Sequence, residues 1–196
     1  MHRELLSVRM VGACALGKVS EVTVLRVRTS FRRSCRLDSL LMLRIAEGDL
    51  CDPHVIGLLQ AHLVAARAAT APGSAHALDL RGLQSPDISF WTIWEGQALL
   101  GCGALKQLSS DHGEVKSMHT VHTMRRKGAG GAMLHHIIKT ARERGMTRLS
   151  LETGASEYFR PARAFYKCHG FQECAPFSDY VLDPNSVFMS LELTKL

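Results

Sequence analysis

A short run of cations and glycines constrains this chain more than any other feature. It follows a β-like stretch (residues 114–121), opens a helix-like one (132–144), and reads Arg125-Arg126-Lys127-Gly128-Ala129-Gly130-Gly131. Backbone without bulky side chains at the start of a helix presents consecutive N–H groups to an anion, and flanking cations add positive charge. The run therefore predicts a phosphate cradle. Its spacing is neither that of a P-loop nor that of the Rossmann fingerprint, so we expect a pyrophosphate site of another kind.

Hydrophobic periodicity predicts alternating strands and helices from residue 43 to residue 193. In chain order we expect a strand at 43–49, a helix at 53–67 capped by Asp52, a short helix or loop at 75–83, a hairpin of strands 90–94 and 97–105, a strand at 114–121, a helix at 130–144, a strand at 149–153, a helix at 161–168, and strands at 171–173 and 186–193. This order predicts an α/β fold in which helices cover both faces of a mixed sheet. Ligands of such sheets bind where neighbouring strands part.

Two motifs in this order carry a resemblance to a known family. In the cradle, Arg125, Gly128 and Gly130 fill the defined positions of the pattern Q/R-x-x-G-x-G/A. Downstream, residues 162–171 (ARAFYKCHGF) match A-x-x-L/F-Y-x-x-x-G-F. On these residues the chain resembles the GNAT superfamily of N-acetyltransferases, and within it a group of little-characterised bacterial members.

The resemblance implies a fold, a co-substrate and its contacts. It implies a GNAT-like acyl-CoA N-acyltransferase fold over residues 42–196, with a splayed pair of central strands, and acetyl-CoA as acyl donor. The pantetheine arm would enter between the strand that ends near Thr120 and the strand that ends near Thr153. Along the arm we expect Met118, His119, Thr120 and Thr153. On the pyrophosphate we expect Arg125, Arg126, Lys127, Gly128, Ala129, Gly130 and Gly131.

The two candidate catalytic residues are Glu114 and Tyr166. Strand alternation places Glu114 on one face with Lys116, Met118 and Thr120. Many relatives carry a glutamate at the matching place that acts as base through water; the alternative is a strand-entry charge paired with Lys116 or solvent. The resemblance implies that Tyr166 lies near the CoA sulfur as general acid, against the alternative of an amphipathic core tyrosine.

The sequence departs from the family pattern at one position. Phe159 stands where many relatives place an asparagine that contacts the cofactor.

We expect direct attack on the thioester by a primary amine of a small molecule. A carboxylate on that acceptor would suit the basic side chains of the first two helices. The pocket candidates are His54, His62, Arg67, His76 and Arg81 on one side, with Phe177, Tyr180 and Asn185 on the other.

The net charge of +6 is concentrated at the N-terminus, because residues 1–41 hold eight basic and three acidic side chains. We expect this basic extension to be a disordered tail, the product of a start upstream of Met42, or a small extra strand at 22–27. The alternative is a targeting or nucleic-acid-binding arm, which we disfavour because no aromatic residues interleave the arginines.

Composition limits the remaining function classes. The six cysteines (Cys14, Cys35, Cys51, Cys102, Cys168 and Cys174) show no metal-like spacing, and neither do the histidines, so we expect reduced cysteines and no metal. The sequence has no apolar stretch long enough to cross a bilayer and no leader pattern, so we expect a cytoplasmic protein. A CoA-binding protein without catalysis is the rival hypothesis, and a homodimer is left open.

Overall fold

One mixed sheet organises the part of the chain that the structure describes, residues 6–13, 19–27, 41–71 and 78–193 of a computed structural model. Its strand order is β1-β2-β3-β4-β5-β6-β7-β9-β8. Neighbouring strands are antiparallel except β6 and β7, which are parallel. The strands are β1 (Leu6–Ala13), β2 (Val19–Val27), β3 (Leu41–Glu47), β4 (Ile88–Glu95), β5 (Ala98–Gln107), β6 (His112–Thr120), β7 (Arg148–Gly154), β8 (Gln172–Glu173) and β9 (Ser186–Glu192).

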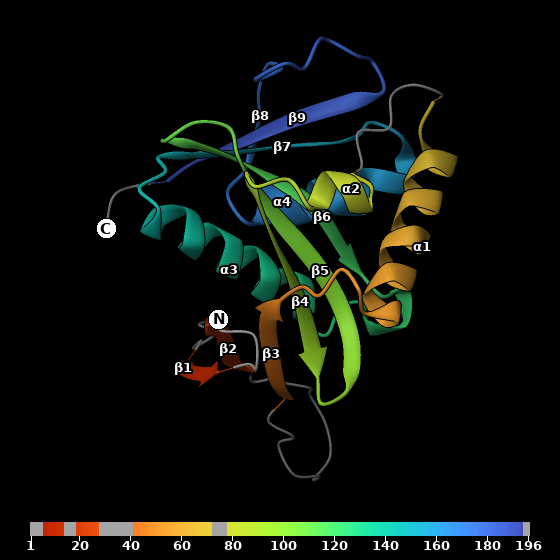
Figure 1. Ribbon diagram of the computed structural model, residues 1–196. Helices are drawn as coiled ribbons and strands as arrows, with labels where there is room; N and C mark the ends of the chain where they lie inside the picture. The colour runs from red at the N-terminus through yellow and green to blue at the C-terminus, as the bar shows by residue number, and fades with distance from the viewer. Residues whose placement is uncertain (1–5, 14–18, 28–40, 72–77, 194–196) are drawn as a thin grey trace, which may run out of the picture.

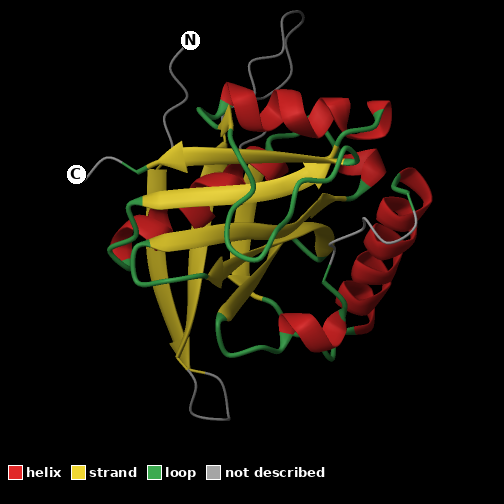
Figure 2. Cartoon of the chain, turned by 90° about the horizontal axis from the view of Figure 1, so that it is seen from above, coloured by secondary structure: helices red, strands yellow, loops and turns green. Residues whose placement is uncertain are grey.

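Helices cover both faces of this sheet, as the sequence predicted (Figure 1 and Figure 2). The helices are α1 (Pro53–Ala69), α2 (Leu80–Leu83), α3 (Ala129–Glu143) and α4 (Arg160–Cys168), with 3-10 turns η1 (His122–Met124) and η2 (Glu157–Phe159). Side chains of α1 and α2, such as Leu59 and Leu83, pack on Phe90 and Cys102 in one core. Side chains of α3 and α4 pack in the other core, which includes Leu105, Leu149 and Leu151.

Local sequence explains where several of these elements begin and end. The Asp52 carboxylate caps α1 by accepting a 2.7 Å hydrogen bond from the backbone N–H of His54. Gly96 turns the β4–β5 hairpin at φ +57°, and Gly145 ends the α3 region at φ +79°. Of the stretch 75–83, predicted as a short helix or loop, residues 80–83 form α2, and residues 72–77 lie outside the described ranges.

The N-terminal strands extend the sheet beyond β3. β2 pairs with β3 from Thr23 opposite Ile45 to Val27 opposite Leu41, and β1 pairs with β2. The strand considered for residues 22–27 thus lies within β2. The assignment of residues 1–41 to an extension separate from the rest of the chain stays a prediction. Within the described ranges, no helix has both the length and the apolar character that crossing a membrane requires.

Candidate active site

The site lies where two central strands part. β6 pairs with β7 only from His112 opposite Arg148 to Glu114 opposite Ser150. Beyond these pairs β6 continues to Thr120 and β7 to Gly154 without hydrogen bonding to each other. The expected splayed pair is therefore confirmed. The end of β6 and the start of α3 line one cavity, and the end of β7 lines the adjoining one.

A bulge in β6 redirects the side chains that follow it. Ser117 has φ +51°, and the register to β5 shifts between Lys116 opposite Ala104 and His119 opposite Cys102. Met118 consequently lies on the α3 side, because a Cβ on Gly103 would lie 2.8 Å from Met118 Sδ.

This bulge corrects one expectation. The prediction that Glu114, Lys116, Met118 and Thr120 share one face is wrong beyond Ser117, since an added residue reverses the alternation. On the α1 side of the sheet, the next side chain after that of Lys116 is therefore His119. Its ring centroid lies 4.8 Å from that of His62.

The larger of two adjoining cavities has a volume of about 510 Å³ and contains most of the predicted cofactor residues. Its lining includes Met118, His119, Thr120, Arg125, Arg126, Gly128, Ala129, Gly130 and Gly131. Gly128 precedes α3 at φ +91°, a left-handed conformation that glycine adopts without strain. Lys127 is exposed beside this cavity without lining it, and its Nζ lies 3.4 Å from Met124 Sδ.

The smaller cavity, of about 120 Å³, continues from the larger one between β6 and β7. Its polar lining consists of His62, Thr70, Lys116, Ser117, Glu152, Thr153 and Tyr166. The Ser117 hydroxyl is buried without a hydrogen-bond partner among the described residues. Such an unsatisfied group favours a polar ligand in this space. Thr153, expected on the pantetheine arm, lines this cavity rather than the larger one.

Six residues line both cavities and form the wall between them: His62, Ala66, Met118, Phe159, Ala162 and Tyr166. Tyr166 is 8% exposed, and burial, reinforced by the Glu152 carboxylate, raises its pKa. Its phenol is therefore protonated at neutral pH. Phe159 packs its ring against Gly154, where a Cβ would lie 2.2 Å from the ring.

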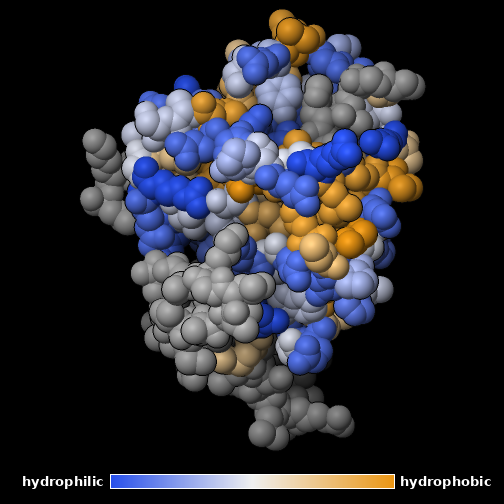
Figure 3. Space-filling view, viewed as in Figure 1, coloured by the Kyte–Doolittle hydropathy of each residue, from blue (hydrophilic) through white to orange (hydrophobic). Residues whose placement is uncertain are grey.

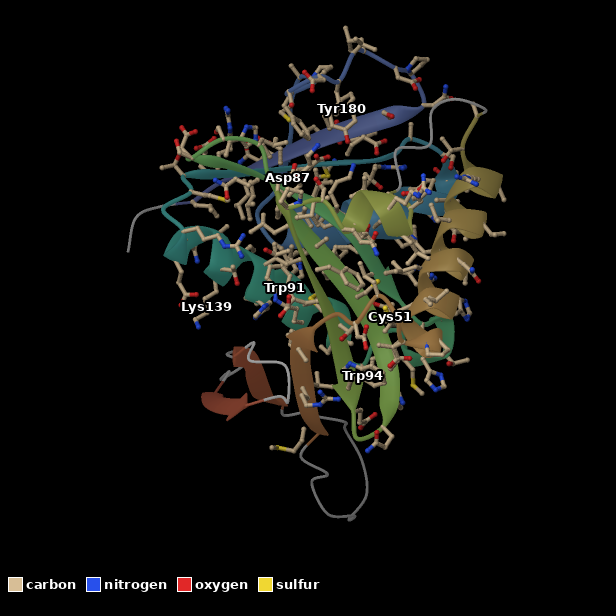
Figure 4. The ribbon with its side chains drawn as sticks, viewed as in Figure 1. Cys51, Asp87, Trp91, Trp94, Lys139 and Tyr180 are labelled. Carbon is tan, nitrogen blue, oxygen red and sulfur yellow. The ribbon has the colours of Figure 1, made fainter. Side chains whose placement is uncertain are left out.

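Glu114 lies outside this wall. Its carboxylate lines neither cavity; it accepts hydrogen bonds from Lys116 Nζ (3.1 Å) and from the Tyr180 hydroxyl (2.7 Å). Lys116 Nζ also donates to the Tyr180 hydroxyl at 2.8 Å. Burial and the adjacent Glu114 raise the pKa of Tyr180. Figure 4 shows Tyr180 over the β9 end of the sheet, in the loop that closes this network.

Two histidines at the mouth of the splay are held in the neutral form. Burial lowers the pKa of His62, and burial together with His62 and Arg125 lowers the pKa of His119 to about 4. Of the basic residues expected at the acceptor pocket, His62 lines both cavities, whereas His54, Arg67 and Arg81 are exposed and line neither, and His76 lies outside the described ranges.

Sequence reasoning missed Glu152 and Ser117. A signal for Glu152 was present, because it is the lone carboxylate inside the otherwise buried strand β7. Ser117 gave none, since its place depends on the bulge. Among the described residues, no group of three or more His, Cys, Asp or Glu side chains is arranged to hold a metal ion.

Comparisons with known proteins agree with this geometry. Residues 58–171 match the sequence model of the acetyltransferase (GNAT) family. Over 145 residues the chain is 50% identical to the uncharacterised N-acetyltransferase YsnE of Bacillus subtilis, covering 74% of this chain and 96% of the relative.

Solved structures show the same fold. An inferred acyl-CoA N-acyltransferase of Klebsiella pneumoniae superposes with a TM-score of 0.64 and 28% identity, covering 79% of this chain and 99% of that one. A GNAT acetyltransferase of Elizabethkingia anophelis with acetyl-CoA bound gives a TM-score of 0.57 at 16% identity, covering 77% and 98%. The splayed strands, the glycine cradle and these matches show that the chain belongs to the GNAT family of acetyltransferases.

Proposed function

We propose that this acetyltransferase moves an acetyl group from acetyl-CoA to a primary amine of a small molecule by direct attack. The observation that carries the proposal is the wall shared by the two cavities. A donor thioester in the larger cavity and an amine in the smaller one would meet there, beside Met118 and Tyr166. The arrangement needs no covalent intermediate on the protein, because both reactants reach the same point.

The lining of the larger cavity suits the chemistry of coenzyme A. Glycines at the start of α3 leave backbone N–H groups accessible to a diphosphate, and Arg125 and Arg126 supply positive charge. Met118 and Phe165 offer apolar contact to a pantetheine arm. Acetyl-CoA bound to a fold neighbour from Elizabethkingia anophelis is consistent with this assignment.

Tyr166 is the proposed general acid. Its neutral phenol at the shared wall would give a proton to the departing thiolate. Glu114, predicted from the sequence as the proton relay, lines neither cavity and meets the smaller one only through Lys116, which its carboxylate contacts; it stays one of the candidate bases. The described cysteines are unpaired, in keeping with the proposed cytoplasmic location.

The acceptor is proposed no more narrowly than a primary amine that the smaller cavity admits. Lys116 is the cation there that a carboxylate on the acceptor could approach. A screen should therefore contain amino acids beside matched amines that lack the carboxylate. Consumption of only the latter would remove the carboxylate from the proposal.

Thiol release from acetyl-CoA tests the function directly. With the best amine of the screen, Tyr166→Phe should lower kcat by roughly 10²–10⁴-fold while the Kd for CoA stays close to wild type. Tyr158→Phe, which removes the phenol of a half-exposed residue that lines only the larger cavity, should change kcat far less. CoA binding without thiol release for any amine would instead support the rival, non-catalytic role.

A further inference from the structure

The wall between the two cavities contains few groups that can exchange a proton. Of the six described residues that line both cavities, four are apolar: Ala66, Met118, Phe159 and Ala162. The other two are His62 and Tyr166. Amide formation has to remove a proton from the amine nitrogen and supply one to the departing sulfur, and these two residues are the groups at the wall that could do so directly.

We infer that His62 is a catalytic residue of this acetyltransferase, the base that accepts the proton of the amine as the amide bond forms. The inference rests on the proposed function, because it assigns the smaller cavity to the acceptor. It concerns a residue of α1, on the sheet face opposite to the core in which Tyr166 is buried.

The position of His62 is fixed by its neighbours. Its helix is anchored in the core beside β5 through Val55, Leu58 and Leu59. On the other side its ring meets His119 of β6, with centroids 4.8 Å apart and planes inclined by 43°. The imidazole is thus held between the helix and the strand that borders the splay, and it reaches both cavities.

The protonation state suits a base. Burial lowers the pKa of His62 below its ordinary value, so the ring is neutral at pH 7 and free to accept a proton. Titratable and charged groups from several elements line the two cavities together with His62. They are Lys116 and His119 of β6, Glu152 of β7, Tyr166 of α4, Tyr158 and His169 on either side of α4, and Arg125 and Arg126 of the cradle, of which Arg125 acts on His119.

The step balances without any other reactant. The neutral amine forms its bond to the acetyl carbon, and the nitrogen passes one proton to His62. As the C–S bond breaks, the sulfur takes one proton from Tyr166. The proton on His62 then returns to the Tyr166 oxygen, directly or through water, and both side chains regain their starting forms.

The lining of the two cavities distinguishes His62 from Glu114 as candidates for the base. Glu114 lines neither cavity, and its carboxylate is engaged by Lys116 and Tyr180. Glu152 lines only the smaller cavity, where its Oε1 accepts a 2.7 Å hydrogen bond from the Ser186 hydroxyl. The substitutions His62→Gln, Glu114→Gln and Glu152→Gln therefore distinguish the three.

The experiment measures thiol release from acetyl-CoA with the best amine of the screen, or with n-propylamine if no other amine reacts faster. His62→Gln should lower kcat by roughly 10²–10⁴-fold with little change in the KM for acetyl-CoA. His122→Gln, at an exposed histidine that lines neither cavity, is the matched control and should keep wild-type kcat.

Two further readouts separate a base from a structural residue. In His62→Ala, added imidazole can enter the space next to both cavities and should restore turnover in proportion to its concentration. In wild-type protein carrying CoA, the ring signal of His62 in NMR should titrate below pH 6.5, the ordinary midpoint of histidine. A ring that is protonated at pH 7 would overturn the inference.

The kinetic measurements distinguish failure of the proposed function from failure of the inference about His62. Wild-type protein that releases no thiol with any amine overturns the proposed function and this inference with it. Active wild-type protein with nearly unchanged kcat in His62→Gln overturns the inference alone. The same holds if Glu114→Gln or Glu152→Gln loses turnover and imidazole fails to rescue His62→Ala.

Discussion

Substituting Gly128 tests whether backbone at the start of α3 holds the diphosphate. Gly128 has φ +91° and ψ −7°, and it directly precedes the helix in the lining of the larger cavity. A side chain in the left-handed region costs about 1–2 kcal/mol. In Gly128→Ala the free loop can relax away from this conformation, and ligand binding must then restore it.

The expected loss of affinity follows from that strain. Because about 1.4 kcal/mol corresponds to tenfold in an equilibrium constant, Gly128→Ala should raise the Kd for CoA by up to about 5- to 30-fold. Isothermal titration calorimetry with CoA measures this directly. Urea denaturation of the free protein measures how much of the strain remains in the absence of ligand.

Gly96→Ala is the matched control for strain without a ligand. Gly96 is also left-handed, at φ +57°, and a Cβ there would meet no atom within 4 Å. It turns the β4–β5 hairpin and lines neither cavity. Gly96→Ala should lower the free energy of unfolding by a similar amount and leave CoA affinity intact. Wild-type affinity in Gly128→Ala would refute the cradle geometry, and so would an equal loss in Gly96→Ala.

Two other substitutions or modifications test the interior around the site. Lys116→Met should lower the free energy of unfolding by about 3–5 kcal/mol, because it leaves Glu114 buried without its cation. Adding Glu114→Gln to this variant should recover part of the loss, and urea denaturation measures both. Lys139→Met, which breaks an exposed pair with Glu143, should cost at most about 1 kcal/mol. Burial raises the pKa of the Cys102 thiol to about 12. At pH 8, iodoacetamide should therefore leave Cys102 unmodified in the native protein, as read by mass spectrometry. Labelling of Cys102 at the rate of the exposed cysteines would contradict this. The exposed comparison set is Cys51, Cys168 and Cys174.

Features that depend on neighbouring residues in the chain were predictable from the sequence. The Asp52 cap and the glycines after β6 act over a few residues, and the apolar period of α3 follows from the positions of Met133 and Ile137. The cradle depends only on short-range spacing, and most of its residues line the larger cavity; their contact with a diphosphate stays a prediction.

Features that depend on a partner distant in sequence were not predictable from the sequence. The bulge at Ser117 requires the register of β5, and alternation alone gave the wrong face for Met118. The burial of Glu114 depends on Tyr180, 66 residues away, which closes over it from the β8–β9 loop. That loop also exposes Val181 and Leu182 (77% and 86% exposed), and Figure 3 shows a small hydrophobic tip at the top of the molecule.

The parting of β6 and β7 would let the proposed proton acceptor and proton donor reach one site from both faces of the sheet. Where strands are hydrogen-bonded, a sheet separates the helices that cover its two faces, and their side chains cannot meet. Here pairing between β6 and β7 stops after Glu114, so His62 of α1 and Tyr166 of α4 line the same two cavities. A proton acceptor and a proton donor can thus approach one reacting centre from opposite sides. The bulge that follows Lys116 then turns Met118 and His119 to different faces, and this gives each helix its own contact with the strand that borders the opening.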